Sequence, residues 1–455
     1  MLDDVHSAYL AQWLKKKIRA HDYYHYKLRL LANCMHYAPP TRGVQIISNG
    51  DMTKILGPRA CNNSWACPEC TAKQMRKYST RIAAALDALS EKGYAATMFT
   101  LTIFHTAMMD CEESFFLLRK AWEIMDKQKT WRRKKKDGSY YVNAGIWSQF
   151  HNEFQFTHHV KTLEVTYGSH GWHPHIHMLI WFKKDDLQKL ADWEEKLNEC
   201  WADCIDKAAK ILYKDNQKSY EVRKFLESKT DRADSQHLGL HISKVTEGKN
   251  AGKIKEWKSG DYLCGWGGNN ELTGLGMKLA HNDNMTPFQM LEKAAELETT
   301  DICQSNRLLE LYLHFAWTVL KNRILRIQFS RTGLKAIIDT HLQTEKFKSV
   351  LKKKKESLKL KAFQNIAWFS SKQWQDICSL DNPYFIPLLK HFAKVPDTIF
   401  KDRYDSYEVG YINAFELICE LCTANNISPP LCVKHPVIDF AQAFNELVLP
   451  EYSAA

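Results

Sequence analysis

The sequence lacks the features that mark several large protein classes. No apolar run approaches the roughly 20 residues that a membrane-spanning helix needs, so no membrane protein is predicted. Residues 1–4 do not begin a secretory signal peptide. The chain contains no internal repeat and no Gly-x-x-x-x-Gly-Lys-Ser/Thr phosphate-binding loop, so no helicase is expected on it. We therefore expect a cytoplasmic protein.

The composition is globular with a basic bias. The chain has 455 residues, 45% of them hydrophobic and 25% charged, which suffices for two or three domains with sizeable cores. Lys and Arg number 63 against 52 Asp and Glu, and this formal charge of +11 favours a polyanionic partner. The 13 cysteines are an odd number without an export signal, so we expect reduced thiols or metal ligands rather than disulfides.

Residues 171–181 carry the strongest chemical pattern. They read as the second strand of a β-hairpin, with residues 159–168 as the first strand and residues 169–172 as the turn. Because side chains alternate between the faces of a strand, His175 and His177 point the same way. Two imidazoles on one face of a rigid strand can hold one divalent ion.

A carboxylate on the neighbouring strand completes this set. If Gly168 pairs with His173, then Glu164 lies directly opposite His177 on the face that also carries His175. The alternative is that these are surface histidines on a half-solvated sheet. His173 shares the parity of the pair, but its place at the turn leaves its direction open.

Cysteines upstream form a second candidate metal site. Cys67 and Cys70 are two residues apart, a spacing at which one tetrahedral zinc ion can bind both thiolates. Cys61 is a third candidate ligand, and Cys34 is preferred over His36 as the fourth. A redox pair and free thiols at a helix start are the alternatives.

These two patterns resemble motifs of one family. The sequence 175–177, preceded by 171–174, is similar to the second motif of the HUH endonucleases, above all their rolling-circle plasmid replication initiators (Rep proteins). The cysteine segment 61–73 resembles the motif that precedes the nuclease domain of Rep proteins. The segment 99–102, Phe-Thr-Leu-Thr, is similar to the first motif of the family, and the resemblance covers about residues 60–335.

The third motif of the family points to one tyrosine. In Rep proteins this motif places a nucleophilic tyrosine on a short helix, with a lysine three positions on and an aromatic residue next. Tyr262 and Trp266 match, but Gly265 stands where the lysine is usual, and residues 268–273 resemble the segment directly after this motif in the family. A tyrosine can attack a phosphodiester and retain the bond energy in a phosphotyrosine. Lys258, four residues earlier, could balance the phosphate charge if the segment is helical.

A run of five cations is the candidate DNA-binding segment. Like charges repel, so a loop is predicted, either merely solvated or binding phosphates while Trp131 stacks on a base. The residues of this hypothesis, with the lysine near the third motif, are Trp131, Arg132, Arg133, Lys134, Lys135, Lys136 and Lys258.

The periodicity predicts several elements around these motifs. Helical spacing of apolar residues covers 71–91 and ends at Gly93, and residues 97–104 alternate as a strand does. Thr286, with Pro287 next and Gln289 three positions on, predicts a capped helix start.

The fold class that we expect is α+β, with the central antiparallel sheet and flanking helices of the HUH endonuclease core. The three predicted regions are an N-terminal helical and zinc-binding segment at 1–92, a nuclease domain at 93–282 and a mainly helical C-terminal region at 283–455.

The resemblance implies a function. It implies a nickase that cuts single-stranded or hairpin DNA at a plasmid origin, with Mg²⁺ or Mn²⁺ on His175, His177 and Glu164 and a structural Zn²⁺ on the cysteines. Tyr262 would keep a 5′-phosphotyrosine link, and a helicase and polymerase of a bacterial or archaeal host would act in trans. The alternatives are an HUH transposase or relaxase, and a non-enzymatic zinc protein that binds nucleic acid.

Overall fold

The computed structural model describes most of the chain between residues 4 and 431. The segments outside the description are 1–3, 22–27, 41–42, 50–52, 129, 135–139, 214–238, 248, 260–271, 274–283, 332, 345–347, 350–363, 381, 395–397, 402–408, 413 and 432–455. For residues 4–7, 130–134, 140–144, 364, 398–401 and 409–412 only the backbone is described.

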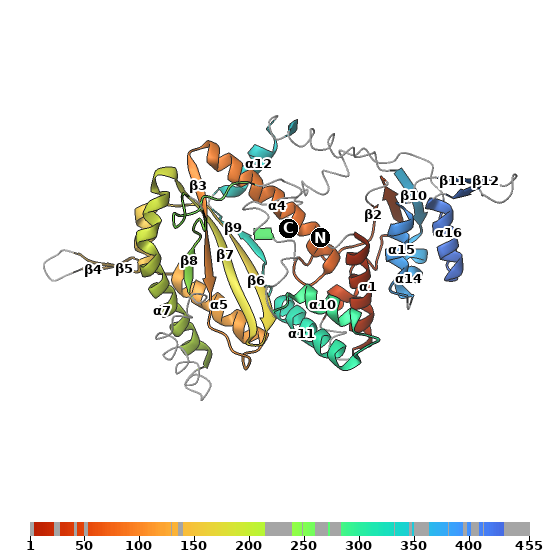
Figure 1. The fold of residues 1–455 in the computed structure, drawn as a ribbon, viewed down its shortest axis with the longest axis horizontal. Coiled ribbons are helices and arrows are strands. Elements are labelled where there is room, and N and C mark those ends of the chain that lie inside the picture. The colour runs from red at the N-terminus through yellow and green to blue at the C-terminus, as the bar shows by residue number, and fades with distance from the viewer. Residues whose placement is uncertain are drawn as a thin grey trace.

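A five-stranded antiparallel sheet forms the centre of the molecule, in the order β8-β3-β7-β6-β9 (Figure 1). Its strands are β3 (Tyr94–Thr102), β6 (His159–Gly168), β7 (Gly171–Lys183), β8 (Leu240–Ile242) and β9 (Ile327–Phe329). The two longest, β6 and β7, are adjacent in sequence and form the predicted hairpin. The candidate histidines therefore lie on a long strand that is paired on both sides, with β6 and with β3.

Helices cover both faces of this sheet, because both faces are apolar over most of their length. One face carries Ile176 and Met178 and packs in the largest core, under α5 (Cys111–Asp126), α6 (Ile146–Phe154) and α7 (Glu194–Tyr213), the last of which comes after the 3₁₀ helix η1 (Lys184–Trp193). The other face carries Leu179 and Trp181 and packs under α4 (Pro68–Glu91) and α12 (Leu334–Leu342). The alternation along β7 thus separates two cores.

The remaining elements come from both ends of the chain and pack against one another. Helices α1 (Asp4–Ala20), α3 (Arg29–Ala32), α10 (Pro287–Glu296) and α11 (Ile302–Lys321) lie together beside the hairpin (Figure 1). A three-stranded sheet, β10-β1-β2, pairs β1 (Val44–Ser48) with β2 (Thr53–Leu56) and with β10 (Gln364–Phe369). Helices α14 (Ser371–Ser379), α15 (Phe385–Phe392) and α16 (Ala414–Ala424) pack on this sheet and build a third core.

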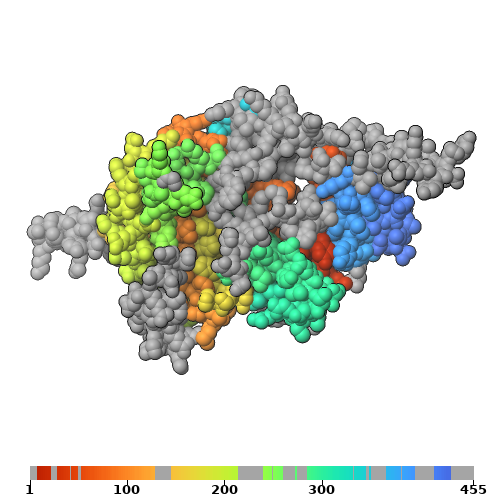
Figure 2. Space-filling view, viewed as in Figure 1, coloured from red at the N-terminus to blue at the C-terminus, as the bar shows by residue number. Residues whose placement is uncertain are grey.

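Two further hairpins stand outside these layers. They are β4 (Thr130–Lys134) with β5 (Tyr140–Ala144), and β11 (Thr398–Lys401) with β12 (Val409–Ile412). In Figure 1 the β4–β5 hairpin projects from the side of the molecule next to α7. In the space-filling view, red residues of the N-terminus lie against the blue residues of the C-terminal helices (Figure 2).

The predicted α+β class with a central antiparallel sheet flanked by helices is confirmed. The helix predicted at 71–91 is α4, and Thr286 caps α10 through a capping box with Gln289. The C-terminal region is less purely helical than predicted, because β9 and β10 join the two sheets. Since β9 lies beyond residue 282 and β10 pairs with β1, packing crosses both expected boundaries, and the division at 92 and 282 stays a prediction.

The prediction of a loop at the cation run is wrong for the part of the run that the structure describes. Residues 130–134 form β4, which pairs with β5 from Thr130 opposite Ala144 to Lys134 opposite Tyr140. The sequence offers a reason: Tyr140, Tyr141 and Val142 favour strands, and Asp137-Gly138 is a hairpin signal between the two segments. This strand propensity outweighs the repulsion between neighbouring cations.

Among the described helices, none is sufficiently long and apolar to cross a bilayer.

Candidate functional site: two clusters of metal-ligating side chains

The β6–β7 hairpin is tighter than predicted. Gly168 pairs with Gly171 rather than with His173, so Glu164 lies opposite His175, and Thr162 lies opposite His177. Gly171 has a φ of 86° and allows the short turn, where an added Cβ would lie 2.7 Å from the carbonyl oxygen of Thr106. The register moves by two residues. Because two residues preserve the parity of a strand, Glu164 stays on the histidine face.

The three predicted ligands converge. The Nε2 atoms of His175 and His177 lie 3.3 Å and 3.4 Å from the same Oε2 atom of Glu164. All three side chains are largely but incompletely buried, with exposed fractions of 15%, 12% and 13%. Ligand atoms of an octahedral ion about 2.1 Å from its centre lie about 3 Å apart. The three side chains therefore fit around a single ion, and this set can bind a metal.

A threonine orients one of the two imidazoles. Thr100 lies opposite His177 on β3, and its Oγ1 is 3.0 Å from His177 Nδ1, which leaves Nε2 to face Glu164. A hydrogen bond to the distal ring nitrogen is the usual way to fix a ligating histidine. His241, on β8, pairs with Thr100 and lies on the same face, but it is not part of the ligand group.

His173 has a partner that sequence reasoning missed. It lies on the predicted face, opposite Thr166, but its ring meets that of His105 edge to face, with ring centroids 4.3 Å apart and Nδ1 atoms 3.1 Å apart. Its ring centroid lies 5.5 Å from that of His175. Its neighbour His105 comes directly after the apolar strand pattern 97–104, and this position was the only signal in the sequence.

The four predicted cysteines form the second cluster. Cys34 lies just after α3, Cys61 lies in the loop before α4, Cys67 is the N-cap of α4 and Cys70 lies in its first turn. Sγ distances of 3.6 Å join Cys34 to Cys67, Cys34 to Cys70 and Cys61 to Cys70. Four sulfurs about 2.3 Å from a tetrahedral zinc ion lie about 3.8 Å apart. The cluster can therefore bind a metal, and His36 instead lies 3.2 Å from Arg19.

Charge around the cysteines is positive on one side. Burial alone would lower the pKa of Lys15, but Glu69 and Cys34 raise it above its ordinary value. Hydrogen bonds from Cys61, Cys67 and Cys70 hold the pKa of Cys34 well below its ordinary value. A thiolate pair or quartet bound to one ion carries negative charge, and the buried ammonium of Lys15 can balance part of it.

A basic cavity of about 910 Å³ opens on the histidine face of the sheet. Phe329 on β9 pairs with Val160, which shares the parity of Glu164, so the cavity and the candidate ligands lie on one face. Its cations come from α4, α12 and the segment between β9 and α12, and they are Lys77, Arg81, Arg331 and Lys335. One carboxylate, Asp339, also lines it and forms an ion pair of 3.1 Å with Arg81. Tyr78 and Phe329 supply aromatic surface, with ring centroids 6.1 Å apart. Cations beside aromatic rings suit single-stranded nucleic acid.

Comparison with known proteins adds one relative.

The chain is similar to "Protein rep" of Streptomyces lividans.

The two sequences are 23% identical over 289 residues, which cover 57% of this chain and 58% of the relative. The chain thus spans less than two thirds of the length of the relative that it matches. No protein-family model and no solved structure matches the chain.

Several predicted residues lie outside the described part of the chain. Tyr262 falls in 260–271 and Lys135 and Lys136 fall in 135–139, so nothing is said of their placement. Trp131, Arg132, Arg133 and Lys134 lie on β4, of which only the backbone is described. Lys258 is described and exposed.

Proposed function

We propose that the protein is a metal-dependent DNA nickase and strand transferase that starts rolling-circle replication from a plasmid origin. The observation that carries the proposal is the convergence of His175 and His177 on one carboxylate oxygen of Glu164. The relative from Streptomyces lividans supports a role in replication initiation through its name. The resemblance to HUH endonucleases supports the specific chemistry, namely nicking through a tyrosine.

The ligand set holds Mg²⁺ or Mn²⁺ in this proposal. A bound ion at this place supplies positive charge to the scissile phosphate as negative charge develops on it. Glu164 contributes a hard oxygen ligand, His175 and His177 contribute imidazoles, and Thr100 keeps the His177 ring oriented. The incomplete burial of the three side chains leaves room for a phosphate oxygen.

Tyr262 is the proposed nucleophile. Its hydroxyl loses a proton as its oxygen attacks the scissile phosphorus, the bond from phosphorus to the 3′ oxygen breaks, and the leaving oxygen takes up a proton to become a free 3′-OH. The 5′ phosphate stays on the tyrosine. A host polymerase extends the 3′-OH while a host helicase separates the strands.

The chain before Tyr262 lies beside the sheet that carries the metal set. Trp257 bridges to Ala96 on β3, the strand that pairs with the histidine strand β7. The chain therefore enters the segment of the third motif next to this sheet, which supports the assignment.

DNA contacts come from two surfaces in this proposal. The cavity lined by Lys77, Arg81 and Arg331, on the same face of the sheet as the metal set, receives the strand. The cation run of β4 and the residues after it, with Lys258, adds phosphate contacts. The four cysteines hold a structural zinc ion, because thiolates prefer zinc over magnesium.

The decisive experiment replaces Tyr262 by phenylalanine. This change keeps the ring and its packing but removes the attacking oxygen, so DNA binding survives and covalent attachment is abolished. The readout is a labelled origin oligonucleotide incubated with Mn²⁺, followed by denaturing electrophoresis and peptide mapping. Tyr167→Phe, at the hairpin tip, is the matched control and retains the adduct. An adduct on a tyrosine other than Tyr262 contradicts the assignment.

A further inference from the structure

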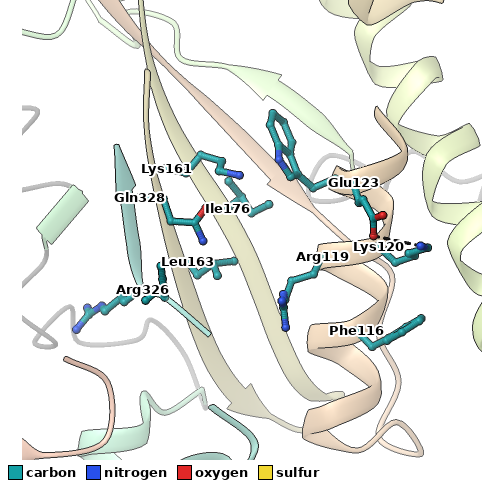
Figure 3. Close-up of a pocket in the computed structure, with 11 residues that line it drawn as sticks. Phe116, Arg119, Lys120, Glu123, Lys161, Leu163, Ile176, Arg326 and Gln328 are labelled. Atoms are coloured by element: carbon teal, nitrogen blue, oxygen red, sulfur yellow. Dashed lines mark hydrogen bonds and ion pairs between the residues drawn. The ribbon is translucent and has the colours of Figure 1, made fainter. Parts of the chain in front are cut away.

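The hairpin that carries the metal set has a second cavity on its other face. The cavity has a volume of about 400 Å³ and lies between α5 and the strands β6, β7 and β9 (Figure 3). Leu163 and Ile176 form part of its wall, and both side chains belong to the large core on the face opposite the histidines. A cavity of this size is within the range of small-molecule sites.

Its charge is positive and largely uncompensated. The lining residues include the cations Arg119, Lys120, Lys161 and Arg326 and one carboxylate, Glu123. Glu123 is already engaged, with ion pairs of 3.1 Å to Lys120 and 2.6 Å to Lys127. Within the described part of the chain, neither Arg119 nor Lys161 has an ion-pair partner. Two cations that form no ion pair and face one open cavity are suited to an anion.

The cavity also has polar and apolar walls at fixed positions. Figure 3 shows Arg119 reaching from α5 toward the strands, while Lys161 and Gln328 point from β6 and β9 toward the helix. Lys161 Nζ lies 4.5 Å from the centre of the Trp122 ring. Phe116 and Leu325 also line the cavity, although they are large apolar side chains with exposed fractions of 39% and 62%. Exposed apolar surface beside cations suits a ligand with a planar ring and an acidic group.

We propose that this cavity binds a nucleotide unit, with its phosphate on Arg119 and Lys161 and its base against the apolar wall. The shared chemistry is a phosphate next to a base, which either a free nucleotide or a single strand of DNA supplies. The site is distinct from the metal set, because it opens on the opposite face of β6 and β7.

The geometry couples this site to the metal set. Ile176 lies between His175 and His177 in sequence, and Leu163 precedes Glu164, so the walls of the cavity are the backs of the metal strands. Arg326 is a second link: its carbonyl oxygen accepts a hydrogen bond of 2.8 Å from the backbone N–H of Leu163, the residue before Glu164. A nucleotide in the cavity therefore acts on the ligand strands from behind, and the site is a candidate effector site for the proposed nickase.

Lys161 makes the affinity dependent on pH. Burial lowers its pKa to about 8, Asp126 opposes this shift and Arg119 adds to it. The other charged groups that line the cavity are Lys120, Glu123 and Arg326, and Glu123 is ion-paired with Lys120 and Lys127. Gln328 on β9 and Met178 on β7 also face Lys161, and they do not titrate. The ammonium form attracts phosphate, so binding weakens as the pH rises through about 8.

The test is calorimetric titration of the full chain with dAMP, inorganic phosphate and a single-stranded hexanucleotide. Lys161→Met and Arg119→Gln each weaken dAMP binding at least tenfold, since each removes one charge from the phosphate site. Lys293→Met, an equal loss of charge on α10, leaves it unchanged. Arg119 is exposed, so its variant keeps the test valid if Lys161→Met does not fold.

The outcomes separate the possible ligands. A hexanucleotide that competes with dAMP and is weakened by Arg119→Gln identifies a DNA strand as the source, whereas dAMP binding without such competition identifies a free nucleotide. If phosphate binds as tightly as dAMP, or if Lys293→Met weakens dAMP as much as the two cavity variants do, the proposal is wrong. Absence of dAMP binding at pH 7 also overturns it.

One variant separates this proposal from the proposed function, on which its effector role rests. His175→Ala removes a ligand of the metal set, but it leaves the cavity cations in place. It retains dAMP binding with its Lys161-dependent loss above pH 8 even if the protein proves not to be a nickase. If dAMP binding is lost in His175→Ala, the titrations have detected the metal face instead, and the cavity proposal is wrong.

Discussion

The two candidate metal clusters are built in opposite ways. The cysteines come from a helix end, a loop and the first turn of α4, and Cys34, Cys67 and Cys70 are all buried. The His/His/Glu set comes from two adjacent strands and remains partly open to solvent. Four soft ligands close the coordination shell of a tetrahedral ion, whereas three ligands leave positions for water or substrate. The comparison teaches that one cluster suits stability and the other suits chemistry.

The two clusters also differ in which parts of the chain surround them. The cysteine cluster lies where separate parts of the chain meet: Lys390 on α15 forms an ion pair of 2.9 Å with Glu69, which lies between Cys67 and Cys70. The indole of Trp374 donates a hydrogen bond to the carbonyl of Met35, next to Cys34. The His/His/Glu set has its support within one sheet, from Thr100 on β3.

The largest expected effect is the loss of nicking when a ligand of the His/His/Glu set is removed. His175→Ala or His177→Ala reduces the rate of plasmid nicking by on the order of 10³-fold, because a site that must stabilise the developing charge loses one of its three ligands. Binding of origin DNA changes little, since it depends on surface cations. Nicking of supercoiled plasmid with Mn²⁺ and fluorescence anisotropy measure the two effects. His173→Ala, on the same strand, is the control, and parallel loss of binding and nicking would contradict a catalytic role.

The next-largest effect concerns the cysteine cluster. Cys67→Ser abolishes tight binding of one zinc ion per chain and lowers the free energy of unfolding by about 3–5 kcal/mol, because the metal contributes directly to folding. His175→Ala leaves both quantities unchanged. Metal analysis of the purified protein and chemical denaturation test this. Cys303→Ser, an exposed thiol on α11, is the matched control. Equal destabilisation by Cys303→Ser, or a wild-type protein without zinc, would remove the distinction between the clusters.

The smallest effect concerns Thr100, whose hydroxyl lies beside His177 of the His/His/Glu set. Thr100→Val keeps the shape of the side chain but removes the hydroxyl beside His177, and we expect Mn²⁺ affinity to fall by about tenfold. The zinc content stays constant. Thr102→Val is the control on the same strand, because the Thr102 hydroxyl bonds to the backbone of Gly239 instead. Titration of Mn²⁺ by electron paramagnetic resonance distinguishes the two variants, and equal weakening in both would show that Thr100 has no orienting role.

Parity was predictable from the sequence, but register was not. The alternation of residues 171–181 places His175 and His177 on one face, and Glu164 on the neighbouring strand joins them as long as any register shift is even. The length of the turn depends on the positive φ of Gly171, which the local pattern does not reveal. The structure brings the predicted ligands together, and their role in metal binding stays a prediction.

Contacts across long sequence separations account for most of what the sequence did not predict. His105 meets His173 because β3 pairs with β7, and no local pattern announces that contact. The cations that line the cavity behind the hairpin come from α5, β6 and the segment around β9, so only the assembled sheet brings them together. Cys34 was predicted as the fourth thiol from residue type alone, without a signal for the turn that positions it.

The pairing of β1 with β10 has a consequence for the synthesis of the chain. Val44 and its neighbours leave the ribosome more than 300 residues before Phe369, their partner in the sheet. At a translation rate of about 5–20 residues per second, β1 waits on the order of 15–60 s for that partner. During this time the open edge of β1 can pair with other strands. The nascent protein therefore needs its C-terminal third before its N-terminal sheet is protected from aggregation.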